Sequence, residues 1–584
     1  MRVWPCLVVL VGCAFLKADA MASPDLSGLW EAQRRFGPEV RGTLLLRATP
    51  DGELEAEIDR FRVAVRREGD GLSFALPGDR GWFRGRFDRE TGDVVGHWYA
   101  PRAMITGLSE ASAVTLRRTG DERWGGRVAP LDDGFTFLLR LDRIGENRYS
   151  AFWRNPERNL GVFFDLDSAE FVDERVLLTG TWRGRGESRV LFEGTVEAGG
   201  GLISVPIPSR GGTYDFRKVA DERSSAFYPR GWDAERYAYR EPPQTGDGWA
   251  TASLGDVGID RGAIEVFVRS ELFVAPDGVH SPYIDGVLIA RHGKLVLEEY
   301  FYGFYRDRPH DTRSASKSAA SVLIGAAIHA GAPVSVDSRV YETMFDGDVP
   351  GGVDPRARRM TLGHLLTMSS GFFCDDGNPD APGNEDTMQE QAEEPDWYRY
   401  TLGVPMAAEP GREAVYCSSN PNLAVGMLGR ITGVPIEEMF YELIAEPLQM
   451  GRYHLLRQPS GEPYWGGGSY WLPRDFMKLG QLMLDGGVWN GRRVLSEEWV
   501  RDATSPLVRI GGHAYGYQWW VREYRAGDRT LNGFFAAGNG GNVVVVIPEA
   551  GLVVAFYGSN YSDPSFVRPQ QSFIERYILP AVGF

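Results

Sequence analysis

A serine and a lysine in the segment Ser314-Ala315-Ser316-Lys317 are spaced for joint chemistry on one helix face. The segment opens a run rich in alanine and other small residues, which predicts a buried helix. Positions i and i+3 of a helix share a face, so the Ser314 hydroxyl and the Lys317 amine can meet. A serine becomes a nucleophile once a base removes its proton, and a lysine can be that base if burial lowers its pKa. We therefore predict that Ser314 is a nucleophile and that Lys317 assists it.

Two later segments could complete such a site. Tyr416 precedes a helix predicted over 423–431, and a phenol beside an ammonium can shuttle the proton. The stretch Asn539-Gly540-Gly541-Asn542 leads into the apolar strand 543–547, and its glycines allow a substrate to approach the backbone closely. The first turn of a helix also offers free N–H groups to an anion. We predict an oxyanion hole formed by the backbone N–H groups of Ser314 and Asn542.

The order and spacing of these segments resemble the serine hydrolase family that includes class C β-lactamases, penicillin-binding proteins, esterases and the amide hydrolase of nylon oligomers. The resemblance covers roughly residues 250–575. The S-x-x-K motif of that family matches Ser314 and Lys317, its Y-x-N motif matches Tyr416-Cys417-Ser418, and its K-T-G or H/W-x-G motif matches Asn539-Gly540-Gly541. The resemblance implies an α/β sandwich with an antiparallel sheet and a helical subdomain. It also implies an acyl-enzyme mechanism with no metal or cofactor.

Two positions depart from the family pattern. Ser418 replaces the usual asparagine, and Asn539 replaces the lysine or histidine that would bind a substrate carboxylate. Both departures favour an esterase or amidase acting on a small-molecule ester or amide. Two alternatives remain open: a β-lactamase or peptidoglycan D-peptidase, and a non-catalytic protein that binds a ligand through its N-terminal half.

The four cysteines and the N-terminus bear on the compartment. Residues 1–20 resemble a secretory signal, with an apolar core and small residues before the cleavage point, which predicts a periplasmic or secreted protein. Cys13 also lies in a lipobox-like sequence, so a lipid anchor there is the alternative. Cleavage after residue 20 would leave only Cys374 and Cys417, which form a disulfide or remain two buried thiols. Given the family resemblance, a bridge would tie the 372–375 loop to the wall of the site.

The overall composition excludes several classes of function. The 584 residues carry a formal net charge of −16 and no long basic run, which argues against nucleic acid and anionic membranes as partners. Beyond the signal, no segment is long and apolar enough to predict a transmembrane span. The eight histidines lack metal-site spacing, and no G-x-S-x-G, P-loop or dinucleotide motif is present.

The chain divides into an all-β N-terminal half and a mixed C-terminal half. Residues 25–220 alternate apolar and polar positions between turns, which predicts a barrel-like domain loosely similar to lipocalins, possibly a repeat of 25–120 and 121–220. Its interior could hold an apolar ligand or be filled by side chains. Residues 221–249 predict a linker. In the hydrolase-like part, 250–584, hairpins near both ends predict one antiparallel sheet built from both chain termini.

Overall fold

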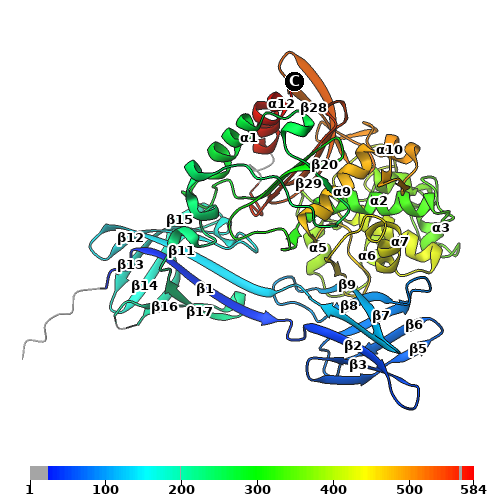
Figure 1. The fold of residues 1–584 in the computed structure, drawn as a ribbon, viewed down its shortest axis with the longest axis horizontal. Coiled ribbons are helices and arrows are strands. Elements are labelled where there is room, and N and C mark those ends of the chain that lie inside the picture. The colour runs from blue at the N-terminus through cyan, green and yellow to red at the C-terminus, as the bar shows by residue number, and fades with distance from the viewer. Residues whose placement is uncertain (1–23, 198, 564–567) are drawn as a thin grey trace, which may run out of the picture.

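A computed structural model describes residues 24–197, 199–563 and 568–584. The predicted signal and Cys13 lie outside the described residues. Within these ranges, none of the helices combines the length and apolar character needed to cross a bilayer. The chain forms a barrel, a second β lobe inserted into it, and a C-terminal α/β domain (Figure 1).

The barrel is a closed ring of eight antiparallel strands. Trp30 of the first strand pairs with Leu139 on one side and with Lys218 on the other, which closes the ring and leaves no free edge. Its interior is filled by side chains, including the buried Trp30, Phe137 and Trp153. The strands in ring order are β1 (Gly28–Gly37), β11 (Asp133–Gly145), β12 (Arg148–Arg154), β13 (Phe164–Val172), β14 (Arg175–Trp182), β15 (Arg185–Val196), β16 (Leu202–Ile207) and β17 (Gly212–Lys218).

The inserted lobe is a curved sheet between β1 and β11 in the sequence. Its two ends, β4 and β5, are separated in the chain by Val65 alone, so the sheet curls until its ends meet. Figure 1 shows β1 running from the barrel toward this lobe. Its strands are β2 (Gly42–Ala48), β3 (Leu54–Ile58), β4 (Phe61–Ala64), β5 (Arg66–Glu68), β6 (Gly71–Ala75), β7 (Trp82–Phe87), β8 (Val94–Ala100), β9 (Ser109–Gly120) and β10 (Arg123–Val128).

The possible repeat of 25–120 and 121–220 stays a prediction, but the strand pairing does not follow its boundary. The all-β character is as predicted, but β1 pairs with β11, which lies about a hundred residues later, and not with β2. The first and last segments of the N-terminal half therefore build one barrel around the lobe between them. Alternating patterns identify strands but do not tell which strands pair.

The C-terminal domain has the predicted sheet with a helical subdomain. The hairpins predicted near 287–300 and 542–557 lie side by side at its centre and join the two ends of the domain. The strand order is β18 (Ala250–Thr251), β20 (Lys294–Tyr300), β19 (Ile284–Arg291), β31 (Leu552–Gly558), β30 (Asn542–Ile547), β29 (Arg529–Gly538), β28 (Trp520–Ala526), β27 (His513–Tyr515) and β26 (Val508–Ile510).

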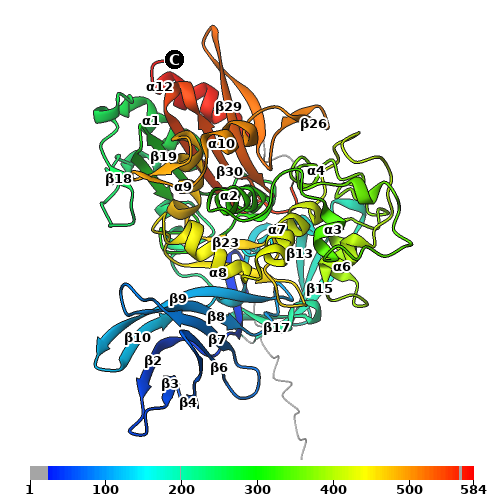
Figure 2. The same ribbon diagram turned by 90° about the vertical axis from the view of Figure 1, so that its right-hand side faces the viewer.

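Helices cover both faces of this sheet, with a separate apolar core on each side. Figure 2 shows α2 between the sheet and the helical subdomain. One face packs on α1 (Arg261–Phe267), α11 (Arg568–Phe573), η13 (Ile574–Ile578) and α12 (Leu579–Ala581). The other side holds α2 (Ser316–His329), α3 (Val340–Met344), α4 (Leu362–Leu366), α5 (Glu385–Glu390), α6 (Trp397–Leu402), α7 (Ser419–Thr432), α8 (Ile436–Phe440), η10 (Tyr441–Ala445), α9 (Pro473–Leu484) and α10 (Glu497–Ala503).

Three short strands connect the inserted lobe to the C-terminal domain. They are β21 (His310–Asp311), β22 (Tyr453–Arg457) and β23 (Ser469–Trp471). Strand β22 pairs with β9 of the lobe and with β23, and β23 pairs with β21. The sheet of the inserted lobe thus continues to a point three residues before Ser314. The sequence analysis did not predict this connection.

The segment predicted as a linker lies against helix α9. The buried Arg474 donates hydrogen bonds to the Pro243 carbonyl at 3.0 Å and to Thr245 Oγ1 at 2.9 Å. The Trp249 indole returns a bond of 3.1 Å to the Arg474 carbonyl. Residues 243–249 are therefore fastened to the C-terminal domain.

Candidate active site

Ser314 and Lys317 meet at the start of α2, as their spacing predicts. Ser314 lies in the short 3-10 turn η8 (Arg313–Ala315), which leads directly into the helix. Lys317 Nζ donates a hydrogen bond of 2.8 Å to Ser314 Oγ and another to the Gly466 carbonyl. Lys317 is 1% exposed, whereas Ser314 is only partly buried, so the hydroxyl is the member of the pair open to a substrate.

The charge state of Lys317 differs from the predicted one. Burial disfavours the ammonium, but Tyr416, Glu385 and Asp376 together outweigh that effect and raise the pKa of Lys317 above its ordinary value. Lys317 is therefore a cation near neutral pH. The sequence indicated burial correctly, but the anionic neighbours come from segments 60 to 100 residues further along the chain.

Asp376 and Glu385 are functional candidates that the sequence analysis missed. The Asp376 carboxylate accepts hydrogen bonds from Ser418 N at 2.8 Å and from Ser418 Oγ at 2.6 Å. Burial, with the nearby Glu385, raises the pKa of Asp376 to about 6, although Lys317 and the Ser418 bonds oppose the rise. Asp376 follows Cys374 by two residues, so the Cys374–Cys417 pairing was the signal that could have placed it here.

Ser418 consequently has a role other than contact with substrate. It is fully buried at the start of α7, and its hydroxyl is engaged by Asp376. Ser418 stands where the family pattern has an asparagine, and its hydroxyl binds the loop that carries Asp376. A serine at this position ties Asp376 beside Lys317.

Tyr416 lies next to the cation. Its ring centroid is 4.9 Å from Lys317 Nζ, and the ring stacks on Trp520 with centroids 5.9 Å apart. The neighbouring Cys417 forms a disulfide with Cys374, with Cα atoms 5.5 Å apart. The two-thiol alternative is therefore not what the structure contains, and the bridge joins the Tyr416 segment to the loop that carries Asp376.

Gly538 is the residue of β29 that packs directly against the nucleophile's turn. A Cβ at this position would lie 2.0 Å from the Thr312 carbonyl oxygen and 3.1 Å from Ser314 N, so only glycine permits the contact. The sequence analysis did not select Gly538, which precedes the predicted motif by one residue. The signal that could have identified Gly538 was its position directly before the glycine-rich turn.

Of the predicted residues, Asn539, Gly540 and Gly541 form the turn between β29 and β30, and Asn542 is the first residue of β30. Asn542 is buried and pairs with Gly538 across the hairpin. Its carboxamide donates to the Asn539 carbonyl at 2.7 Å and to the Gly558 carbonyl at 3.2 Å. Asn539 Oδ1 accepts a bond from Ser562 N at 2.8 Å. These side chains hold the hairpin in shape, and the Asn542 N–H as an oxyanion donor stays a prediction.

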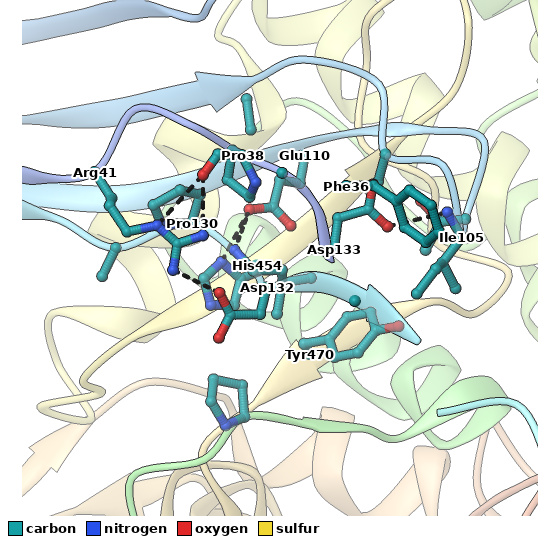
Figure 3. Close-up of a pocket in the computed structure, with 18 of the residues that line it drawn as sticks. Phe36, Pro38, Arg41, Ile105, Glu110, Pro130, Asp132, Asp133, His454 and Tyr470 are labelled. Atoms are coloured by element: carbon teal, nitrogen blue, oxygen red, sulfur yellow. Dashed lines mark hydrogen bonds and ion pairs between the residues drawn. The ribbon is translucent and has the colours of Figure 1, made fainter. Parts of the chain in front are cut away.

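A cavity of about 810 Å³ lies where the barrel, the inserted lobe and the C-terminal domain meet (Figure 3). Its wall includes Phe36 and Glu110 from the β domains and His454 and Tyr470 from the connecting strands. The barrel interior is packed, so of the two alternatives for that interior the structure shows the one filled by side chains. Across the described ranges, no cluster of three or more His, Cys, Asp or Glu side chains could hold a metal.

Comparison with known proteins finds similarity in the C-terminal half of the chain. Residues 284–570 match the family model described as Beta-lactamase. The 6-aminohexanoate-dimer hydrolase of Paenarthrobacter ureafaciens is 26% identical over 264 residues, which cover 42% of this chain and 66% of that relative, slightly less than two thirds of its length. Simvastatin synthase from Aspergillus terreus aligns over 52% of this chain and 95% of its own, with TM-score 0.42 and 19% identity. A penicillin-binding protein homolog from Caulobacter crescentus aligns over 55% and 97%, with TM-score 0.42 and 13% identity.

Proposed function

We propose that this chain, whose residues 284–570 match the beta-lactamase family model, is a serine acyl hydrolase for small esters or amides. The observation that carries the proposal is the 2.8 Å hydrogen bond from a buried, cationic Lys317 to the partly exposed Ser314 hydroxyl. A buried ammonium is costly to maintain, so its position on a serine oxygen calls for a chemical role.

In the first step, Ser314 Oγ attacks the carbonyl carbon of the substrate and its proton passes to the Lys317/Tyr416 pair. Lys317 remains cationic, stabilises negative charge on Tyr416, and donates to Ser314 Oγ. The oxygen of the tetrahedral intermediate is held by Ser314 N–H and by a second N–H from the β29–β30 hairpin beside Gly538. Tyr416 is thus the proton acceptor in this scheme.

In the second half of the reaction, Tyr416 returns its proton to the departing alcohol or amine, and the acyl group stays on Ser314. Water then attacks the acyl-enzyme as Tyr416 accepts its proton, and Tyr416 passes that proton to Ser314 Oγ as the carboxylic acid leaves. None of these steps involves oxidation or reduction. We also propose export to the periplasm or beyond, which the Cys374–Cys417 disulfide supports.

The test is turnover of a short-chain p-nitrophenyl ester and of the matching p-nitroanilide by the wild type and by Ser314→Ala. We expect the variant to lose at least about a thousandfold in kcat while keeping its melting temperature, because the nucleophile is removed from a partly exposed position. Wild-type-like turnover by Ser314→Ala would refute the assignment. The control is Ser321→Ala, one helical turn after Lys317, because the buried Ser321 hydroxyl makes no hydrogen bond within the described residues.

The two alternatives make different predictions. A β-lactamase or D-peptidase would be labelled covalently by a fluorescent penicillin at Ser314, and Asn539, in place of a cation, argues against this. A non-catalytic binder would hold its ligand equally well after Ser314→Ala. Since the barrel interior is filled, the junction cavity offers such a ligand space instead.

A further inference from the structure

The strand that precedes the nucleophile is held by a buried residue of the barrel. Arg154, the last residue of β12, is 1% exposed, and its Nη2 lies 3.1 Å from Ser559 Oγ and 3.8 Å from Asp285 Oδ1. The other oxygen of Asp285 lies 3.0 Å from His310 Nε2. The buried Asp285 carboxylate therefore joins Arg154 of the barrel to His310 of strand β21, and His310 lies four residues before Ser314.

Two aromatic rings and a backbone carbonyl hold the guanidinium of Arg154 in place. It lies 3.9 Å from the ring centroid of Tyr283 and 4.6 Å from that of Tyr302, and it donates to the Ala226 carbonyl at 3.2 Å. A planar cation held between two rings and bound to an anion has little freedom to move. Arg154 lies outside the matched residues 284–570, whereas Asp285, which it contacts, lies inside them.

A second connection reaches the same strand through the backbone. Ala111 of β9 pairs with Leu455 of β22, and Trp471 of β23 pairs with His310 of β21. Ser112 Oγ adds a bond of 2.7 Å to His454 Nδ1, which fixes β9 on β22. The segment just before β23 supplies the Gly466 carbonyl that accepts from Lys317. The inserted lobe is therefore linked, through β22 and β23, to the segment before Ser314 and to the segment that contacts Lys317.

We propose that the two N-terminal β domains hold the catalytic turn in its reactive geometry and that Arg154 is a positioning residue for Ser314, acting through Asp285 and His310. The inference rests on the proposed hydrolase function. Displacement of a nucleophile by about 1 Å can reduce turnover about a hundredfold, so a rigid anchor four residues away is effective. A positioning role affects the rate of reaction more than the binding of substrate.

The experiment compares full-length Arg154→Met, Arg154→Lys and Arg175→Met by ester hydrolysis and by hydrogen–deuterium exchange of the peptide 310–317. Arg175 lies on β14 of the same barrel in an exposed ion pair with Glu193 and is the matched control. We expect Arg154→Met to lower kcat about 10- to 100-fold with KM within about twofold, and to speed exchange in that peptide. Arg154→Lys should restore part of both, and Arg175→Met should match the wild type.

The outcomes separate this proposal from the hydrolase assignment. A folded Arg154→Met with wild-type kcat and unchanged exchange overturns the positioning role. If the wild type hydrolyses no ester, the hydrolase proposal loses its support, while the exchange measurement still tests the anchoring of 310–317. Should Arg154→Met fail to fold, Ser112→Ala replaces it, because that variant removes one hydroxyl and keeps the backbone pairing. Faster exchange over 310–317 in Ser112→Ala supports the proposal, and unchanged exchange overturns it.

Discussion

Lys317 shows how the charge of one side chain depends on residues that are distant in sequence. Burial alone would favour the neutral amine, but Tyr416, Glu385 and Asp376 surround it and keep it charged. A charged lysine cannot accept the serine proton. The acidic neighbours therefore shift the base role in the proposed mechanism from Lys317 to Tyr416.

The raised pKa of Asp376 predicts how the stability of the folded chain depends on pH. Its pKa is about 6 in the folded chain against an ordinary value of 3.8, so between these values the folded chain binds the proton more tightly than the unfolded chain. The contribution of Asp376 to stability therefore falls as the pH rises through that window. We expect Asp376→Asn to gain in stability relative to the wild type between pH 4 and pH 7, by up to about 3 kcal/mol.

Urea unfolding at several pH values measures this difference. Asp380→Asn, an exposed carboxylate of the same loop, is the control and should follow the wild-type curve. If the curves of Asp376→Asn and the wild type ran parallel from pH 4 to pH 7, the elevated pKa would be wrong.

At the scale of elements, the disulfide joins two segments that each carry a part of the site. Cys374 precedes Asp376 by two residues, and Cys417 follows Tyr416 directly. The bridge closes a loop of 43 residues and so restricts the unfolded chain. It also limits the freedom of Tyr416 relative to Lys317.

We expect the double variant Cys374→Ala/Cys417→Ala to lose about 2–4 kcal/mol of stability, because an unfolded chain without the bridge has more freedom. Its kcat should fall several-fold as Tyr416 loses its tether. Calorimetry and ester turnover measure the two effects, and wild-type protein treated with a reducing agent serves as an independent comparison. Unchanged stability and turnover in both samples would show that the bridge does not support the site.

At the scale of the whole molecule, the inserted lobe and the helical subdomain share a polar interface centred on Glu437. This carboxylate is 5% exposed and accepts from Arg84 at 2.7 Å and from the Tyr99 hydroxyl at 2.5 Å. Nearby, the more exposed Glu442 binds Arg86 at 2.5 Å. Glu437 and Glu442 both bind an arginine of strand β7, but only Glu437 is buried.

We expect Glu437→Ala to destabilise the protein by about 3 kcal/mol, because it leaves Arg84 and Tyr99 without their buried acceptor. Glu442→Ala should cost less than about 1 kcal/mol, as exposed ion pairs do. Urea unfolding of both variants gives the comparison. Equal losses in the two would mean that the Glu437 cluster does not hold the lobe in place.

The sequence alone determined the features that depend on local pattern. The i, i+3 spacing of Ser314 and Lys317 placed them on one helix face, and apolar runs on either side of turn residues identified the strands of both hairpins. The same local patterns favoured an all-β N-terminal half and a mixed C-terminal half. These predictions succeed because helix and strand periodicity are properties of short segments.

Only the tertiary structure decided which segments meet. It paired β1 with β11 and so nested one β lobe inside a barrel, and it placed Tyr416, Glu385 and Asp376 near Lys317, where together they raise the pKa of the lysine despite its burial. It also brought Arg154 to Asp285, across 131 positions of sequence. Strand pairing, burial of charge and pKa are set by neighbours in space, and the pattern along the chain carries no record of those neighbours.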